Sequence, residues 1–233
     1  MNKKIPAELF MRPIRSFVLR QGRLTKSQYQ ALKNEWPVYG IERGDSLLNI
    51  DSLFDKKSPV TLEIGFGNGV SLAEMAERAP DKNFIGIEVH RPGVGRLLHL
   101  IKEKALTNLR VMDDDAVEII KHRIPEGSLD RVQLFFPDPW HKKRHNKRRI
   151  VQPDFVALVA SRLKLGGVFH MATDWGPYAE YMAEVMEASD EFVSIADSPF
   201  SSKPDERPTT KFETRGLRLG HGVWDLLYEK SVG

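Results

Sequence analysis

From residue 60 onward, short apolar runs alternate with longer amphipathic segments. Five of these runs have the length and composition of buried parallel strands, at residues 60–66, 83–89, 109–112, 131–136 and 168–173. Apolar residues recur at helical spacing between them, as in 152–165, which Gly166 and Gly167 are expected to end, and in 177–189. This alternation predicts an α/β fold with a doubly wound, mostly parallel sheet and helices on both faces.

The two ends of the chain carry other patterns. Residues 192–196 and 224–230 are predicted to be two last strands, which would complete a seven-stranded sheet. The polar segment 198–222 between them, rich in Pro and Gly, is expected to be a functional loop. Residues 1–55 hold many basic and few apolar positions, so we expect a basic, partly mobile N-terminal arm with one helix near 27–35.

Composition limits the classes of protein that remain. The chain of 233 residues is long enough for one large α/β domain, which we place at residues 56–233. It has no cysteine, which excludes disulfides, thiolate metal sites and a thiol nucleophile, and its histidines show no metal-type spacing. No run approaches the roughly 20 apolar residues of a membrane helix, so we expect a cytoplasmic protein.

Acidic residues follow successive predicted strands. Gly65, Gly67 and Gly69 allow a tight turn after the first strand, where a ligand can approach the backbone closely. Glu88 ends the second strand, where an acid can accept ribose hydroxyls, and Asp115 follows the third, where an acid can bind an adenine amino group. The structural alternative makes Glu88 a helix N-terminal acid and Asp115 an N-cap.

The same segment lacks the features of a phosphate site. No lysine follows the glycines, as a P-loop would require, and their spacing is not that of a dinucleotide-binding turn. An adenosine held by acids, without a phosphate cradle, indicates S-adenosylmethionine. The cationic sulfonium and ammonium of that cofactor also suit an acid-lined pocket.

An acid and a dense basic run follow the fourth predicted strand. Asp138 lies between Pro137 and Pro139, which restrict the loop, and next to the expected position of a transferable methyl group. Trp140 offers a flat face for stacking a base. Six Lys/Arg and two His within residues 141–149 favour contact with nucleic-acid phosphates. The alternatives are a proline-rich turn with a buried tryptophan and a solvated run of charge.

Two later segments add candidate contacts. Asp174 and Trp175, at the end of the fifth strand, again combine an acid with an aromatic residue. Glu213 could accept hydrogen bonds from the N1 and amino edge of a guanine, with Thr210 helping to hold the base. The alternative is an ordinary surface loop.

Taken together, the motifs resemble those of a known family. The residues that carry the likeness are LEIGFGNG at 62–69, GIEVHRPGVG at 86–95, DAVE at 115–118, FFPDPWHKKRHNKRRIV at 135–151, TDW at 173–175 and TKFETRG at 210–216. They closely resemble the bacterial tRNA (guanine-N7-)-methyltransferases, over most of the chain. The resemblance implies a Rossmann-like class I methyltransferase domain that transfers a methyl group from S-adenosyl-L-methionine to N7 of a guanosine in the tRNA variable loop, at position 46.

The resemblance also implies roles for single residues. Cofactor contacts are expected at Glu63, Gly65, Gly67, Gly69, Glu88, Asp115 and Asp138, and Asp138 is also the expected catalytic residue. Substrate contacts are expected at Lys142, Asp174, Thr210, Lys211, Phe212 and Glu213. RNA-binding surface is expected at Arg144, His145, Asn146, Lys147, Arg148 and Arg149. The implied partner is tRNA, with no metal and no membrane, and the protein is expected to be a monomer or a homodimer.

Two other functions stay open at this point. Asp138-Pro139-Trp140 is similar to the Asp/Asn-Pro-Pro-aromatic motif of exocyclic-amine methyltransferases, although tryptophan replaces the second proline. A non-catalytic tRNA-binding protein with a relic cofactor fold is the alternative from another class, and the acids at successive strand ends disfavour it.

Overall fold

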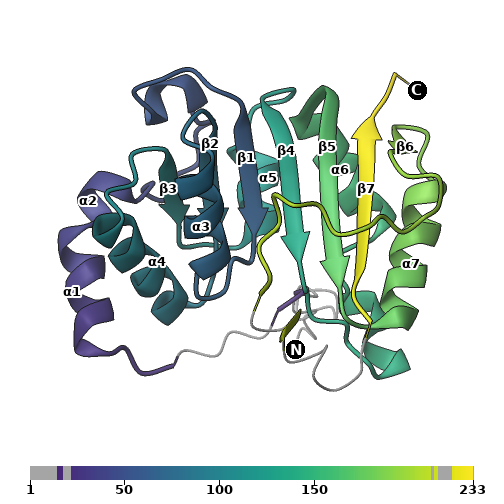
Figure 1. Ribbon diagram of the computed structural model, residues 1–233, viewed down its shortest axis with the longest axis horizontal. Coiled ribbons are helices and arrows are strands. Elements are labelled where there is room, and N and C mark those ends of the chain that lie inside the picture. The colour runs from purple at the N-terminus through teal and green to yellow at the C-terminus, as the bar shows by residue number, and fades with distance from the viewer. Residues whose placement is uncertain (1–14, 18–21, 211–212, 215–221, 233) are drawn as a thin grey trace, which may run out of the picture.

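Seven β-strands form one sheet at the centre of the protein, with helices on both of its faces (Figure 1). The computed structural model describes residues 15–17, 22–210, 213–214 and 222–232. The strands are β1 (Val60–Ile64), β2 (Asn83–Ile87), β3 (Leu109–Met112), β4 (Leu129–Phe135), β5 (Leu163–Thr173), β6 (Phe192–Ser194) and β7 (Trp224–Lys230). Their order is β3-β2-β1-β4-β5-β7-β6, and β7 pairs antiparallel with both β5 and β6 while the pairs from β3 to β5 are parallel. The predicted doubly wound, mostly parallel sheet is confirmed.

Helices on the two faces bury two apolar clusters. The helices are α1 (Lys26–Asn34), α2 (Trp36–Tyr39), α3 (Val70–Arg78), α4 (Arg91–Glu103), α5 (Ala116–His122), α6 (Pro153–Arg162) and α7 (Gly176–Glu187). On one face α3 and α4 bury Leu72 and Leu97, and α1 lies outside α4 (Figure 1). On the other face α6 and α7 bury Phe155 and Met182 beside α5. None of the described helices is both long and apolar enough to span a bilayer.

Helix α6 ends earlier than the periodicity predicts. The sequence pattern predicts a helix over 152–165, whereas α6 stops at Arg162 and β5 begins at Leu163. The carbonyl oxygens of Ser161 and Arg162 accept hydrogen bonds from the backbone N–H groups of the loop before β4 instead of from a further helical turn. Apolar spacing alone could not predict this, because the partners lie more than 30 residues away in the chain.

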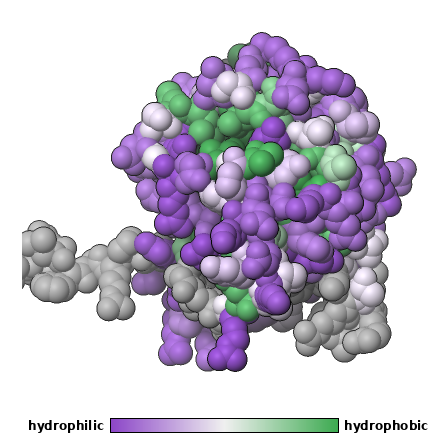
Figure 2. All heavy atoms as spheres, turned by 90° about the vertical axis from the view of Figure 1, so that its left-hand side faces the viewer, coloured by the Kyte–Doolittle hydropathy of each residue, from purple (hydrophilic) through white to green (hydrophobic). Residues whose placement is uncertain are grey.

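The N-terminal helix is specified by local sequence. α1 begins at a capping box in which Thr25 and Gln28 exchange side-chain and backbone hydrogen bonds, and the helix predicted near 27–35 is confirmed. The side of the molecule that carries α1 and α2 is shown in Figure 2, where most of the surface is hydrophilic and apolar side chains gather in the upper part.

The segment between α1 and β1 shares the core of the sheet. Ile41, Ile50 and Phe54 are buried in the same cluster as β1 and β2, and the Ile41 N–H donates to the carbonyl of Val111 in β3. The sequence pattern predicts neither α2 nor the short 3-10 helix η2 in this segment. The division of the chain at residue 55 and the mobility of the arm stay predictions, although residues 22–55 pack on the domain.

Strand order places a ligand site between β1 and β4. The chain passes from β1 outward to β2 and β3, and then returns to β4 on the other side of β1. In open α/β sheets, ligands bind at such a reversal, outside the carboxyl ends of the strands. The segment after β6 crosses in front of β7, β5 and β4 (Figure 1), which brings residues 198–210 of the predicted loop over the sheet.

Candidate active site

A cavity of about 560 Å³ opens at the carboxyl ends of β1, β2 and β4. Gly65, Glu88, Asp115 and Asp138, all expected as cofactor contacts, line it together. Phe135 and Phe136 form part of its wall. The reversal in strand order therefore gathers four of the predicted residues around one space large enough for a nucleoside-sized ligand.

The glycine turn brings backbone to the edge of this cavity. Gly65, Gly67 and Gly69 have φ angles of +71°, +60° and +72°, in the left-handed region that disfavours other residues. Gly93 at the start of α4 is equally constrained, because a Cβ there would lie 2.0 Å from the carbonyl oxygen of Gly67. The turn and α4 thus meet backbone to backbone, as a ligand-binding turn requires.

Glu88 joins the ends of β1 and β2. Its Oε2 accepts a hydrogen bond from the Gly67 N–H at 2.8 Å, and its Oε1 accepts from the N–H groups of Val89 at 2.7 Å and His90 at 2.9 Å. These bonds fix the carboxylate against the cavity. Oε1 already accepts two hydrogen bonds and Oε2 accepts one, so Oε2 has a further lone pair for a ribose hydroxyl.

Asp115 has the structural role that the sequence left open. Its Oδ1 accepts from the Val117 N–H at 3.1 Å, which makes it the N-cap of α5. Burial raises the pKa of Asp115, and the bond from Val117 opposes that change. The residue also lines the cavity, so the expected contact with an adenine amino group stays a prediction alongside the N-cap role.

Glu63 is a buried acid beneath the glycine turn. The residue is 4% exposed, and its Oε2 has no hydrogen-bond partner among the described residues. Burial, with a smaller contribution from Glu88, raises the pKa of Glu63 to about 8. A cationic ligand group beside this oxygen would supply the missing partner and would oppose the effect of burial on the pKa of Glu63. The residues present therefore fit a cofactor with an ammonium or sulfonium group.

The buried carboxyl of Glu63 should make stability fall with pH. Between about pH 4.5 and pH 8 the folded protein keeps a proton on Glu63 that the unfolded chain has released, so the free energy of unfolding decreases as pH rises through this window. The Glu63→Gln variant should escape this loss. Its free energy of unfolding relative to wild type should increase by up to about 1.4 kcal/mol per pH unit.

Urea denaturation at pH 5 and pH 8, without cofactor, measures the difference. Glu118→Gln is the matched control, because the Glu118 side chain is 65% exposed and should leave the pH dependence of wild type unchanged. A stability difference between Glu63→Gln and wild type that is the same at both pH values would contradict the raised pKa.

The loop after β4 has a strained backbone around Asp138. Phe136 and Trp140 have φ angles of +51° and +47°, which non-glycine residues adopt at a cost. The exposed Asp138 accepts a hydrogen bond through Oδ1 from the Trp140 N–H at 3.0 Å. With Pro137 and Pro139 on either side, these contacts hold the carboxylate at the mouth of the cavity.

Trp140 does not offer a free face for stacking a base. Its ring is buried, the Arg148 guanidinium lies 3.8 Å from the ring centroid, and its indole N–H donates to the carbonyl of Ser16 at 3.1 Å. Arg148 also donates to the carbonyls of Arg15 and Phe17 at 3.1 and 3.3 Å. The expectation of base stacking on Trp140 is therefore wrong, and Trp140 and Arg148 clamp residues 15–17 beside the cavity.

The basic run divides into an exposed and a buried part. Exposed side chains occur at His141, Lys142, Lys143, Arg144 and Lys147, while His145 and Asn146 are half-buried in the 3-10 helix η3 (Lys143–Arg148). Arg149 is only 7% exposed. Its Nε donates to the carbonyl of Pro139 at 3.0 Å, and its guanidinium lies over the rings of Tyr178 and Tyr181. Arg149 thus supports the loop that carries Asp138. The sequence could not predict this role, because it depends on the burial of the Arg149 side chain.

The expected substrate residues Lys142, Asp174, Thr210 and Glu213 are not among the described residues that line the cavity. Asp174 follows β5 and is half-buried, and the neighbouring Trp175 ring lies edge-on against His141 of the basic run, with 4.5 Å between ring centroids. Thr210 and Glu213 form a capping box, in which the Glu213 N–H donates to Thr210 Oγ1 at 3.1 Å and the Thr210 N–H donates to Glu213 Oε2 at 3.3 Å. Lys211 and Phe212 lie outside the described residues.

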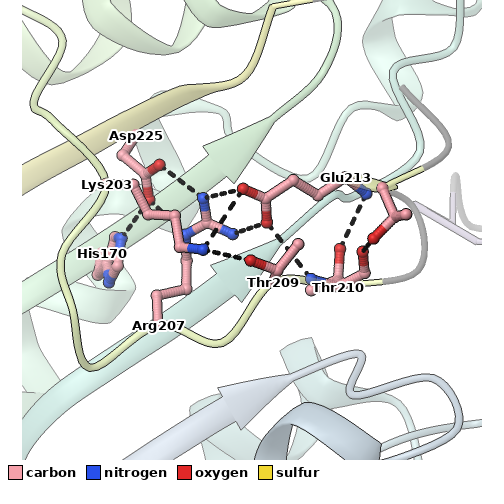
Figure 3. A network of polar contacts seen from close by, with 8 residues as sticks. His170, Lys203, Arg207, Thr209, Thr210, Glu213 and Asp225 are labelled. Carbon is pink, nitrogen blue, oxygen red and sulfur yellow. Dashed lines mark hydrogen bonds and ion pairs between the residues drawn. The ribbon is translucent and has the colours of Figure 1, made fainter. Parts of the chain in front are cut away.

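Three residues of this region were not expected from the sequence. Arg207, Asp225 and His170 form a buried polar network with Glu213 on the face of the sheet (Figure 3). A signal was present, because His170 and Asp225 interrupt otherwise apolar strands and Thr210 and Glu213 have the S/T-x-x-E spacing of a capping box.

Comparison with known proteins agrees with this geometry. A family model described as "Putative methyltransferase" matches residues 57–226. Relatives from Escherichia coli (strain K12) and Shigella flexneri, both named tRNA (guanine-N(7)-)-methyltransferase, are each 59% identical over 221 residues, which is 94% of this chain and 92% of the relative.

Solved structures add information on the fold. The 16S rRNA methyltransferase KamB has a TM-score of 0.60 at 17% identity and covers 82% of this chain and 97% of its own. The antibiotic-resistance methyltransferase Kmr has a TM-score of 0.53 at 12% identity and covers 79% of this chain and 92% of its own. At such low identity these likenesses show a shared Rossmann-like methyltransferase fold and carry no conclusion about substrate.

Proposed function

The chain belongs to the tRNA (guanine-N(7)-)-methyltransferase family, and we propose that it transfers a methyl group from S-adenosylmethionine to N7 of the guanosine at position 46 in the tRNA variable loop. The observation that carries this proposal is the cavity at the reversal in strand order, where Glu88, Asp115 and Asp138 meet beside an exposed basic run. A nucleoside site and a phosphate-binding surface thus share one loop. We also propose that the enzyme acts in the cytoplasm, and the expectation of a monomer or a homodimer stays a prediction.

The strand ends would hold the cofactor through their acids. Glu88 and Asp115 line the cavity and are proposed to accept from the ribose and from the adenine amino group. Glu63 does not line the cavity, but its Oε2 has no partner among the described residues, and it is proposed to face the cationic methionine part with the glycine turn. When bound, the cofactor supplies an electrophilic methyl group on a sulfonium. The protein's own contribution is to orient the two reactants and to exclude water between them.

Asp138 is proposed as the catalytic residue, acting by charge and position. Guanine N7 has a lone pair in the plane of the ring and no proton at neutral pH, so the attack needs no general base. The purine gains positive charge as it is methylated, and a carboxylate held at the mouth of the cavity stabilises that charge. The bond from Trp140 and the adjacent prolines fix Asp138 before the substrate arrives.

The target base would be held between the end of β5 and the segment at 210–213. Asp174 is proposed to bind the guanine, with Lys142 and Thr210 as further substrate contacts, and Lys211 and Phe212 as contacts outside the described residues. Guanine N7 can be engaged in tertiary contacts in folded tRNA, so we propose that the base swings out of the stack to reach Asp138.

The exposed part of the basic run is proposed to bind the tRNA backbone. Lys143→Ala combined with Arg144→Ala should raise the KM for tRNA, because both side chains are exposed and each can neutralise one phosphate. The slope of log(kcat/KM) against log salt should become shallower by roughly one to two units. Steady-state kinetics between about 50 and 200 mM salt measure this change, because phosphate contacts weaken strongly over this range.

A matched double variant separates local from general charge effects. Lys56→Ala combined with Lys57→Ala removes the same charge from two exposed residues that precede β1, at the opposite edge of the sheet. It should keep the wild-type KM and salt slope. Equal salt slopes of log(kcat/KM) for the two double variants would contradict the assignment of the basic run as a tRNA-binding surface.

The other candidate functions lose support from family membership. Relatives named for guanine N7 argue against an exocyclic-amine methyltransferase, and relatives named as methyltransferases argue against a non-catalytic tRNA-binding protein. Incubation with labelled S-adenosylmethionine and total tRNA, followed by nucleoside analysis, tests the proposal. The label should appear in N7-methylguanosine, and label on an exocyclic amine or no incorporation would contradict it.

A further inference from the structure

Arg207 is buried between two carboxylates on the face of the sheet. Its Nε and Nη2 donate to Oδ1 and Oδ2 of Asp225 at 2.7 and 2.8 Å. On its other side Nη1 and Nη2 donate to Oε2 and Oε1 of Glu213 at 2.7 and 3.3 Å. The Arg207 side chain is 1% exposed, so one guanidinium joins Glu213 to Asp225 of β7 away from water (Figure 3).

The network is anchored on two strands. Asp225 belongs to β7, and its Oδ1 also accepts from Nε2 of His170 in β5 at 2.8 Å. Burial lowers the pKa of His170, so its ring is neutral, and Nδ1 has no partner among the described residues. Nε2 therefore carries the proton that it donates to Asp225. Burial opposes the charge on Asp225, but the bonds from His170 and Arg207 keep its pKa below the ordinary value.

Arg207 also touches the wall of the cavity. Its guanidinium lies 5.8 Å from the ring centroid of Phe135 and 5.7 Å from that of Phe136, and both rings line the cavity beside Asp138. Arg207 is thus in contact with the segment proposed to hold the guanine and with the residues that lead to the catalytic loop. Glu213, Asp225 of β7 and the phenylalanines of the cavity wall thus all lie against the buried guanidinium of Arg207.

The Glu213 carboxylate is buried and held by several donors in this arrangement. Glu213 is 4% exposed and accepts from Arg207 and the Thr210 N–H, and Lys203 lies 3.7 Å away. Oε2 thus accepts two hydrogen bonds and Oε1 accepts one, so the position of this carboxylate is set mainly by Arg207. The expected contact between Glu213 and the guanine edge stays a prediction.

We propose that Arg207 is a positioning residue, which holds Glu213, and with it Thr210, at a fixed distance from the cavity wall. In this account Arg207 determines where the Glu213 carboxylate lies, and the two residues act as one unit. The inference rests on the proposed function, because it gives the segment its purpose in the methylation of a tRNA guanine.

A double-mutant cycle on turnover tests the inference. Arg207→Lys keeps the charge but cannot pair with two carboxylates at once, and Glu213→Gln keeps the shape but loses the ion pair. Each should lower kcat by about tenfold, because a displacement of about 1 Å in positioning groups has effects of this order or larger. If the two residues act as one unit, the double variant should be no more than about threefold slower than the slower single variant.

One further measurement and two further variants make the outcome unambiguous. The Kd of S-adenosylmethionine, by calorimetry, should stay within about threefold of wild type in every variant, which shows that the fold and cofactor site are intact. Glu206→Gln is the matched control, since Glu206 lies on the same segment, is 59% exposed and pairs with Arg131 on the surface. It should turn over like wild type. If Arg207→Lys fails to fold, Asp225→Asn replaces it in the cycle with the same expectation.

Two results would overturn the inference. Multiplied losses in the double variant would mean that Glu213 acts on the substrate independently of Arg207. Wild-type turnover in Arg207→Lys, or in Asp225→Asn, would mean that the network does not position the segment. Failure of the wild-type protein to methylate tRNA would instead contradict the proposed function, so the two failures are distinguishable.

Discussion

Replacement of Asp138 by alanine is expected to reduce methyl transfer to tRNA by at least about 100-fold. The carboxylate lies at the mouth of the cavity and is held by the Trp140 N–H, so it is preorganised for the charge that develops on the purine. Alanine removes that charge and leaves the walls of the cofactor cavity in place. The loss should therefore fall on kcat, with a smaller weakening of S-adenosylmethionine binding.

Asp138→Asn is the variant that separates charge from position. The amide keeps an oxygen that can accept from Trp140, so the loop should keep its shape while the negative charge is lost. A rate close to that of Asp138→Ala would show that charge is the main contribution. Single-turnover rates with saturating cofactor measure the effect, and a near-normal rate in Asp138→Ala would end the assignment of a catalytic role.

Arg149→Met is expected to lower kcat by about 10- to 100-fold without changing the salt dependence of tRNA binding. Arg149 is buried, donates to the Pro139 carbonyl next to Asp138, and lies over the rings of Tyr178 and Tyr181. Methionine fills similar space but cannot donate, so the loop that carries Asp138 should lose its fixed position. The sequence alone grouped this residue with the phosphate-binding surface.

Lys147→Met is the matched control within the same basic run. Lys147 is exposed, so its loss should raise the KM for tRNA and flatten the salt slope while kcat stays close to wild type. The two variants should thus affect different kinetic constants. If Arg149→Met changed the salt slope as Lys147→Met does, Arg149 would belong to the RNA-binding surface after all.

Much of the fold could be predicted from local patterns. Apolar runs that alternate with amphipathic segments specify buried strands and covering helices, and the capping box at Thr25 and Gln28 specifies the start of α1. The end of α6 could not be predicted, because it depends on hydrogen bonds from the loop before β4. Local pattern also gives no signal for α2 and η2, which are packed by contacts with the sheet.

For the site, too, features set by local sequence could be predicted, and features set by contacts between distant residues could not. Acids at strand ends could be found from the sequence, because parallel strands bring their carboxyl ends to one edge. The burial of single side chains could not be found in this way. Arg149 and Trp140 were therefore expected at the surface, although residues distant in the chain enclose both. The ion pairs of Arg207 with Glu213 and Asp225 depend on how the segment after β6 crosses the sheet.

The central claim is methylation of guanine N7 in the tRNA variable loop. N7-methylguanosine can be converted to a site of chain scission, so its position can be read from fragment lengths. Unmodified tRNA should be incubated with the wild-type protein and S-adenosylmethionine, beside a tRNA in which the guanosine at position 46 is replaced by adenosine. Cleavage at position 46 of the first tRNA and none in the second is the predicted result. Cleavage elsewhere, or methyl incorporation without cleavage, would contradict the account.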